Sequence, residues 1–185
     1  MKKLLPLLCV FVLLLCGCGG VKSPTTLTLT PRVIPESGKQ AVKYFRQDLE
    51  YAIKEDNYVA LVCTSNMYDP LVQYQHCEFA LKDIAFIRSL LTTLKETEFS
   101  SVEWYDRSLS GCGGYIGLSL EYENGLLPLC GIRVDETVLA FSYSESSAYK
   151  CTLRDPELAE EIQRMIEQQC VNEGFELVPI LSETE

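Results

Sequence analysis

The sequence predicts an α+β fold, in which an antiparallel β-meander is flanked by α-helices within a single domain. Residues 115–153 alternate between apolar and polar side chains and are divided by short turns, which is typical of consecutive antiparallel strands. On either side of this region, apolar residues recur every three or four positions, as on one face of an amphipathic helix. A run of strands bounded by helices favours the α+β class over a regular alternation of strands and helices.

The meander is expected to contain four strands. The first, residues 115–122, is followed by Asn124-Gly125, which is typical of a type I′ hairpin because both central residues need positive φ. Pro128 has no N–H to donate, so it indicates that the next strand lies at an edge or contains a bulge. The other strands are expected at residues 127–134, 137–143 and 148–153.

Three helices and one further pair of strands are expected around the meander. Ser37 and Gln40 can form a capping box at the start of the first helix. Asp83 is expected to cap the second helix, and Asp155, with Pro156 in the first turn, is expected to cap the third. The further pair of strands, at residues 58–64 and 74–81, precedes the second helix.

The beginning of the chain is typical of a cleaved signal peptide. Lys2 and Lys3 supply positive charge, and residues 4–15 form an apolar run. This run is too short to cross a bilayer as a helix, which needs about 20 residues. It ends in Leu-Cys-Gly-Cys at residues 15–18, which resembles the lipobox of bacterial lipoproteins.

The resemblance implies a location for the protein. In that family the thiol of the final cysteine receives a diacylglyceryl group and the chain is cut before it, so Cys18 would become the lipidated N-terminus. Two or more acyl chains, such as palmitate, hold a protein durably on a membrane. The protein is therefore expected at the cell membrane, lipid-anchored on its extracytoplasmic side.

The expected organisation follows from this lipidation site. Residues 1–17 form the signal peptide, 18–37 the lipidated tether, 38–181 the globular domain and 182–185 a disordered tail. Within the domain, residues 175–181 are expected to form a short strand or a docked tail. The layout of residues 58–170 also resembles small α+β domains of uncharacterised lipoproteins from Gram-positive bacteria. That likeness rests on no diagnostic motif and implies no activity.

The charge balance argues against nucleic acid as a partner. The chain has 16 Lys and Arg residues against 26 Asp and Glu residues. Loss of Lys2 and Lys3 with the signal peptide leaves 14 against 26, a net charge of −12. A surface this acidic repels phosphate backbones.

Six cysteines remain after the signal peptide and the lipidation site are set aside. They are Cys63, Cys77, Cys112, Cys130, Cys151 and Cys170. An even number outside the cytoplasm is compatible with disulfides, and we expect at least one among them. The alternative is that they are buried free thiols acting as small hydrophobic side chains.

The sequence does not reveal a catalytic site. His76 is the one histidine, and on a strand its neighbour Cys77 would point to the opposite face. No motif for a hydrolase, nucleotide or metal site occurs, and no cofactor is expected. Acids near the hairpin ends are predicted to be solvated turn residues; they are Glu121, Glu123, Asp135 and Glu136.

These observations favour a binding module over an enzyme. The expected partner is an envelope protein, a peptide or a wall component, in addition to the membrane that holds the lipid. The candidate binding surface consists of Trp104, Tyr105, Gly111, Gly113 and Gly114. The alternative is a thiol-based redox or hydrolytic enzyme of the cell envelope. The thiol enzyme would use Cys112 with Cys63, Cys77 or Cys130, and the hydrolase would be centred on His76.

Overall fold

The computed structural model describes residues 34–67, 75–105, 115–134, 136–144 and 147–175. Over these ranges the chain forms three helices and one antiparallel sheet of seven strands, which confirms the predicted α+β class. In the part of the chain described, no helix is both long and apolar enough to cross a membrane.

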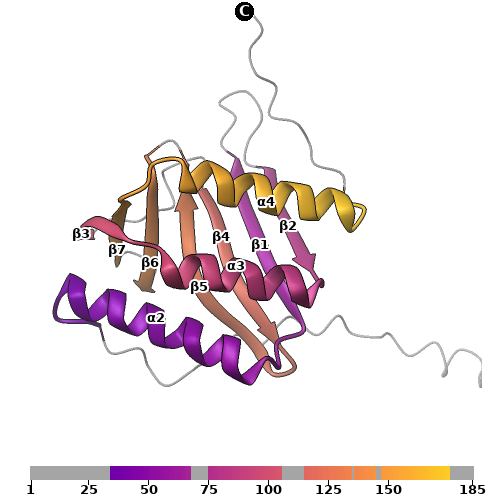
Figure 1. Cartoon of the computed structure of the whole chain (residues 1–185), viewed down its shortest axis with the longest axis horizontal. Helices are drawn as coiled ribbons and strands as arrows, with labels where there is room; N and C mark the ends of the chain where they lie inside the picture. Colours follow the sequence, from indigo (N-terminus) through magenta and orange to yellow (C-terminus); the bar gives the residue numbers. More distant parts are fainter. Residues whose placement is uncertain (1–33, 68–74, 106–114, 135, 145–146, 176–185) are drawn as a thin grey trace, which may run out of the picture.

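The helices and strands are labelled in Figure 1. The helices are α2 (Gly38–Glu55), α3 (Ile84–Glu96) and α4 (Leu158–Asn172). The strands are β1 (Ala60–Met67), β2 (Gln75–Leu81), β3 (Phe99–Tyr105), β4 (Tyr115–Tyr122), β5 (Gly125–Arg133), β6 (Val138–Ser144) and β7 (Ser147–Leu153). Their order in the sheet is β2-β1-β4-β5-β6-β7-β3.

The molecule has two layers, because all three helices cover the same face of the sheet (Figure 1). The core lies between these layers and draws on every helix, with Leu49 of α2, Leu90 of α3 and Ile162 of α4 all fully buried. Leu120 and Leu139 meet them from the sheet. The apolar periodicity of the helices is therefore explained by burial against one face of the sheet.

The four strands of the predicted meander, β4 to β7, are consecutive neighbours in the sheet. Leu118 pairs with Cys130 and Ser119 pairs with Pro128, so Leu129 is an extra residue on β5. This β-bulge accommodates the proline inside the sheet and confirms one of the two predictions made from Pro128.

A strand that the sequence analysis missed, β3, lies at one edge of the sheet, and β2 lies at the other. Because α3 links β2 to β3, this helix carries the chain across the whole width of the sheet (Figure 1). Within the described residues β3 pairs only with β7, from Phe99 opposite Leu153 to Tyr105 opposite Ala148. It is this crossing that brings β3 beside the N-terminal half of α2.

Two of the three predicted helix caps are confirmed. The Ser37 hydroxyl accepts from the N–H of Gln40 at 3.3 Å, and the Asp83 carboxylate accepts from Ala85 and Phe86 at 2.9 and 3.1 Å. The prediction that Asp155 caps the last helix is wrong.

The chain makes a turn between β7 and α4, and α4 begins only at Leu158. Its N-cap, Glu157, makes no side-chain cap hydrogen bond. Asp155 instead accepts from the N–H of Glu157 at 3.0 Å within the preceding turn.

Both ends of the described domain are fastened to the sheet. Pro35 is buried, and its carbonyl accepts a hydrogen bond of 2.9 Å from the Tyr149 hydroxyl on β7. The last part of the predicted tether is therefore packed against the domain. At the other end, the Phe175 ring packs edge-on against Phe79 on β2, with centroids 5.3 Å apart.

Candidate functional site

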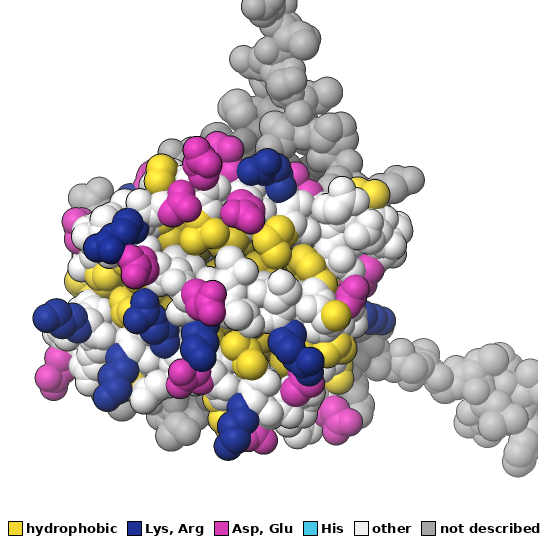
Figure 2. All heavy atoms as spheres, in the orientation of Figure 1, with side chains coloured by type: hydrophobic (Ala, Val, Ile, Leu, Met, Phe, Trp, Pro, Cys, Tyr) yellow, Lys and Arg dark blue, Asp and Glu magenta, His cyan; other side chains and the backbone are white. Residues whose placement is uncertain are grey.

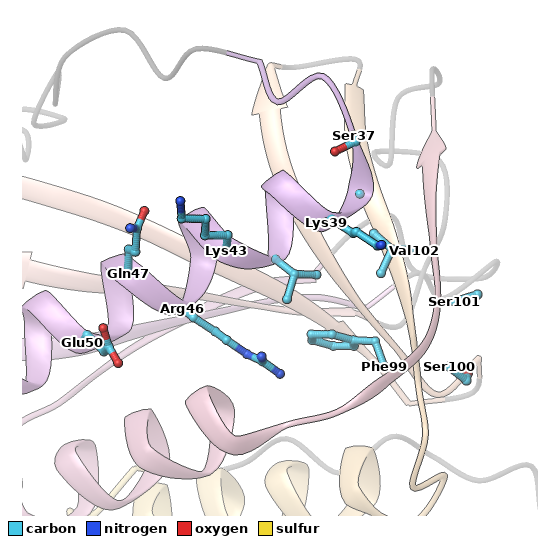
Figure 3. Close-up of a pocket in the computed structure, with 12 residues that line it drawn as sticks. Ser37, Lys39, Lys43, Arg46, Gln47, Glu50, Phe99, Ser100, Ser101 and Val102 are labelled. Carbon is cyan, nitrogen blue, oxygen red and sulfur yellow. The ribbon is translucent and has the colours of Figure 1, made fainter.

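A groove of about 900 Å³ lies between α2 and β3 (Figure 3). Helix α2 contributes Lys39, Val42, Lys43 and Arg46 to its lining, and Figure 3 shows Phe99 of β3 lying alongside this helix. The lining residues Val42, Phe99 and Val102 are half-buried and packed against the core. The groove therefore combines an apolar base with a rim of basic side chains.

A close contact between α2 and β3 fixes one end of the groove. A Cβ atom added to Gly38 would lie 2.7 Å from Val102 Cγ1 and 2.9 Å from Val102 Cβ. The absence of a side chain at Gly38 thus lets the first turn of α2 rest directly on β3. Gly38 therefore permits the short distance between α2 and β3 at this end of the groove.

The charge of the groove is opposite to that of the chain as a whole. Lys39, Lys43 and Arg46 lie within residues 38–47, a segment that contains no acid. The Arg46 guanidinium donates to the carbonyl of Thr97 at 3.0 Å. Neither lysine has an ion-pair partner among the described residues.

Among the described residues that line the groove, the one acid is Glu50, which is paired with Lys95 at 3.2 Å. Figure 2 shows Lys and Arg side chains concentrated over the half of this face that carries α2, whereas Asp and Glu predominate over α4. The cations of this half of the face would therefore attract an anionic group to the groove.

No protein-family model, curated protein or solved structure that we compared with this chain matches it.

Two residues of the predicted binding surface belong to the strand that borders the groove. Trp104 is 43% exposed, and its ring packs edge-on against Tyr149 with centroids 4.9 Å apart. Tyr105, the last residue of β3, is half-buried. The other predicted residues, Gly111, Gly113 and Gly114, lie outside the described residues.

The expectation of disulfides is wrong for four of the six cysteines. The structure shows Cys63, Cys130, Cys151 and Cys170 as buried free thiols. Cys130 on β5 and Cys151 on β7 are separated by β6, which puts them about 10 Å apart, too far for a disulfide. The side chain of Cys77 on β2, and Cys112, lie outside what the structure describes.

Burial also makes these thiols poor nucleophiles. It raises the pKa of Cys130 and Cys151 to about 12 and that of Cys170 to about 11. Burial raises the pKa of Cys63 as well. Because the thiolate is the reactive form, the structure argues against Cys63 and Cys130 as the catalytic thiols of the alternative enzyme.

The remaining candidates for chemistry are not brought together by the fold. His76 pairs with Asn66 between β2 and β1, but its side chain is not among those described. Glu136 forms ion pairs with Arg133, at 2.9 Å, and with Lys150. Within the described ranges, no three His, Cys, Asp or Glu side chains are grouped so as to hold a metal ion.

The basic residues of the groove escaped the sequence analysis, although a signal for them was present. On a chain with ten more acidic than basic residues, ten consecutive positions with three cations and no acid stand out. By contrast, no sequence pattern indicated that β3 would lie opposite these basic residues.

Proposed function

We propose that this protein is a membrane-anchored extracytoplasmic lipoprotein, and that the groove between α2 and β3 binds a component of the cell envelope. The observation that carries the binding role is the groove itself, with its apolar base and two lysines that have no ion-pair partner among the described residues. The lipobox-like sequence that ends at Cys18 supports the location.

The composition of the groove suits binding of an anionic ligand. Val42, Phe99 and Val102 offer apolar surface, and Lys39 and Lys43 offer ammonium groups that no acid of the described chain neutralises. Sites that combine an apolar base with a few charged groups gain affinity from the first and orientation from the second.

The domain would present the groove near its anchor. The described chain begins at Ile34, and Pro35 is held against β7, the strand next to β3. The described chain therefore begins beside the neighbour of the strand that borders the groove, and with a lipid on Cys18 a partner at the membrane surface would lie within reach.

The location is tested by replacing the lipidated cysteine. We expect Cys18→Ala to move the protein from the membrane fraction to the carbonate-washed supernatant, because no acyl chains would remain to hold it. Cys16→Ala, which alters a cysteine that is removed with the signal peptide, should leave the protein in the membrane. Retention of the Cys18→Ala variant in the washed membrane would contradict the lipid assignment.

The binding role is tested by site-specific photocrosslinking in intact cells. A photoreactive residue in place of Gln47, which lines the groove and leaves both lysines intact, should give a discrete adduct of higher mass. The same residue at position 54, in the last turn of α2, should not. Equal adducts from both positions, or none from position 47, would refute the groove as a binding site.

A further inference from the structure

We propose that the occupant of the groove is an extended acidic peptide segment of a partner protein, which adds as a further strand to the free edge of β3. This inference rests on the proposed binding function, and it specifies the chemistry of the partner.

The backbone of β3 provides the first argument. β3 is the last strand of the sheet, and within the described chain it pairs on one side only, with β7. After a register shift between Phe99 and Ser101, its pairing is regular from Ser101 to Tyr105. An edge strand offers a row of N–H and C=O groups to an added strand, and peptides bind many domains in this way.

The side chains of β3 provide the second argument. Val102 and Trp104 are two positions apart on the strand, so both lie on the face that carries the helices. There Val102 meets Gly38 and Trp104 packs against Tyr149. An added strand would place every second side chain beside these two residues. Apolar side chains at those positions would cover Val102 and the exposed part of Trp104.

Charge complementarity provides the third argument. Lys39 and Lys43 lie on the α2 wall of the groove, over a segment without acids, while the remainder of the chain is strongly acidic. The net negative charge of the chain would repel an acidic peptide, whereas Lys39 and Lys43 would attract it to the groove. This difference favours both an acidic partner and binding at the groove.

An anionic wall polymer fits the groove less well than a peptide. A polyphosphate chain could reach the lysines, but it has no apolar side chains for Val42, Phe99 and Val102, and no backbone amides for β3. The combination of features in the groove therefore favours a polypeptide.

The test uses the full chain in detergent micelles and an eight-residue peptide with glutamate at positions 1 and 3, valine at positions 5 and 7 and threonine at the other positions, so that glutamate and valine share the face turned toward α2. Trp104 is the one tryptophan of the protein, so its emission reports binding at β3 without a label. We expect saturable binding with a shift of Trp104 emission, and weaker binding at higher salt because exposed charges are screened. A peptide in which lysine replaces glutamate should bind at least tenfold more weakly.

The strand geometry is tested by methylating alternate backbone nitrogens of the peptide, which removes the donors that pair with β3. We expect at least a tenfold loss of affinity when the methylated edge faces β3. If the methylated peptide binds with the same affinity as the unmethylated peptide, strand addition is overturned.

The cationic contribution is tested by the double variant Lys39→Glu, Lys43→Glu, which should weaken binding of the acidic peptide at least tenfold. The matched control, Lys54→Glu with Lys82→Glu, changes the net charge equally but lies outside the groove. All four side chains are exposed, so far-UV circular dichroism should show an unchanged fold in both variants. An equal loss of affinity in the control variant would overturn the inference.

A further arm separates this inference from the proposed function. Suppose that polyphosphate binds the unaltered chain, that it does not bind the Lys39→Glu, Lys43→Glu variant, and that the peptide binds neither. The peptide inference is then overturned and the binding role of the groove stands. If neither probe binds and position 47 gives no photocrosslink, both are overturned.

Discussion

At the scale of single residues, Glu173 at the end of α4 joins parts of the chain far apart in sequence. Its carboxylate accepts from the backbone N–H groups of Lys82 and Asp83, at 2.8 and 3.1 Å, and from the Gln169 amide at 2.9 Å. Burial raises the pKa of Glu173, but these hydrogen bonds to its charged form outweigh burial and hold the pKa below its ordinary value.

We expect Glu173→Gln to lower the free energy of unfolding at pH 7 by about 1 kcal/mol, because a neutral amide accepts these hydrogen bonds more weakly. The pKa is depressed in the folded state, so the advantage of the carboxylate is present above its unfolded pKa of about 4.3 and disappears as pH falls through the lower folded value. Urea unfolding at pH 7 and at pH 3 measures this difference. Glu123→Gln, in the exposed β4–β5 hairpin, is the control, and an equal effect there would show that the hydrogen bonds of Glu173 contribute nothing.

The buried cysteines lead to a second prediction at this scale. Cys63, Cys130, Cys151 and Cys170 should resist alkylation by iodoacetamide at pH 8 in the native protein, because burial raises the pKa of each thiol and blocks access. All four should react after unfolding in guanidinium chloride. Peptide mapping by mass spectrometry gives the extent at each site, and rapid native labelling of any of the four would contradict the burial described.

At the scale of elements, the contact between α2 and β3 decides the shape of the groove. Gly38 begins α2 and rests on Val102, whose branched side chain has little freedom to move aside. Glycine is ordinarily a weak helix former. Its presence here is explained by the strand beneath it, and not by the preferences of the helix.

We expect Gly38→Ala to destabilise the protein by about 1–3 kcal/mol through overpacking, although alanine is the better helix former. In a chain that already carries Val102→Ala, the same substitution should cost clearly less, because the closest contact, with Val102 Cγ1 at 2.7 Å, is gone, while the contact with Cβ at 2.9 Å remains. A double-mutant cycle by urea unfolding measures the coupling between the two sites. Additive effects of the two substitutions would be inconsistent with this contact.

At the scale of the whole molecule, one core unites both edges of the sheet. Leu81 on β2 and Leu153 on β7, the strand that holds β3 in the sheet, belong to the same buried cluster as the helices. Because α3 runs from one edge to the other, the sheet cannot be completed until the chain has crossed it. The edge that borders the groove is thus tied to the central core and not to a separate unit.

A single core predicts cooperative unfolding. Trp104 fluorescence reports on the edge strand β3, and far-UV circular dichroism reports on the helices, so the two signals should give the same urea midpoint. Loss of the Trp104 signal at a lower urea concentration would show that β3 detaches before the core unfolds.

Local sequence determined a large part of this fold. Alternation and short turns predicted β4 to β7, and Ser37 and Asp83 predicted the starts of two helices. These features depend on residues only a few positions apart, whose hydrogen bonds and burial are decided by the local backbone. The Asp155 prediction failed because the same local chemistry also stabilises a turn.

Tertiary structure alone decided the rest. Residues 99–105 show no clear alternation, and they became a strand because β7 offered them an edge. The four described cysteines became inert thiols because the core enclosed them, and Lys39 came to face Val102 because α3 carried the chain across the sheet. The pattern of apolar residues along the chain predicts which side chains are buried. It does not predict which segments bury them, because those contacts form between residues far apart in the sequence. For that reason the sequence determined the class of fold, and only folding produced the groove.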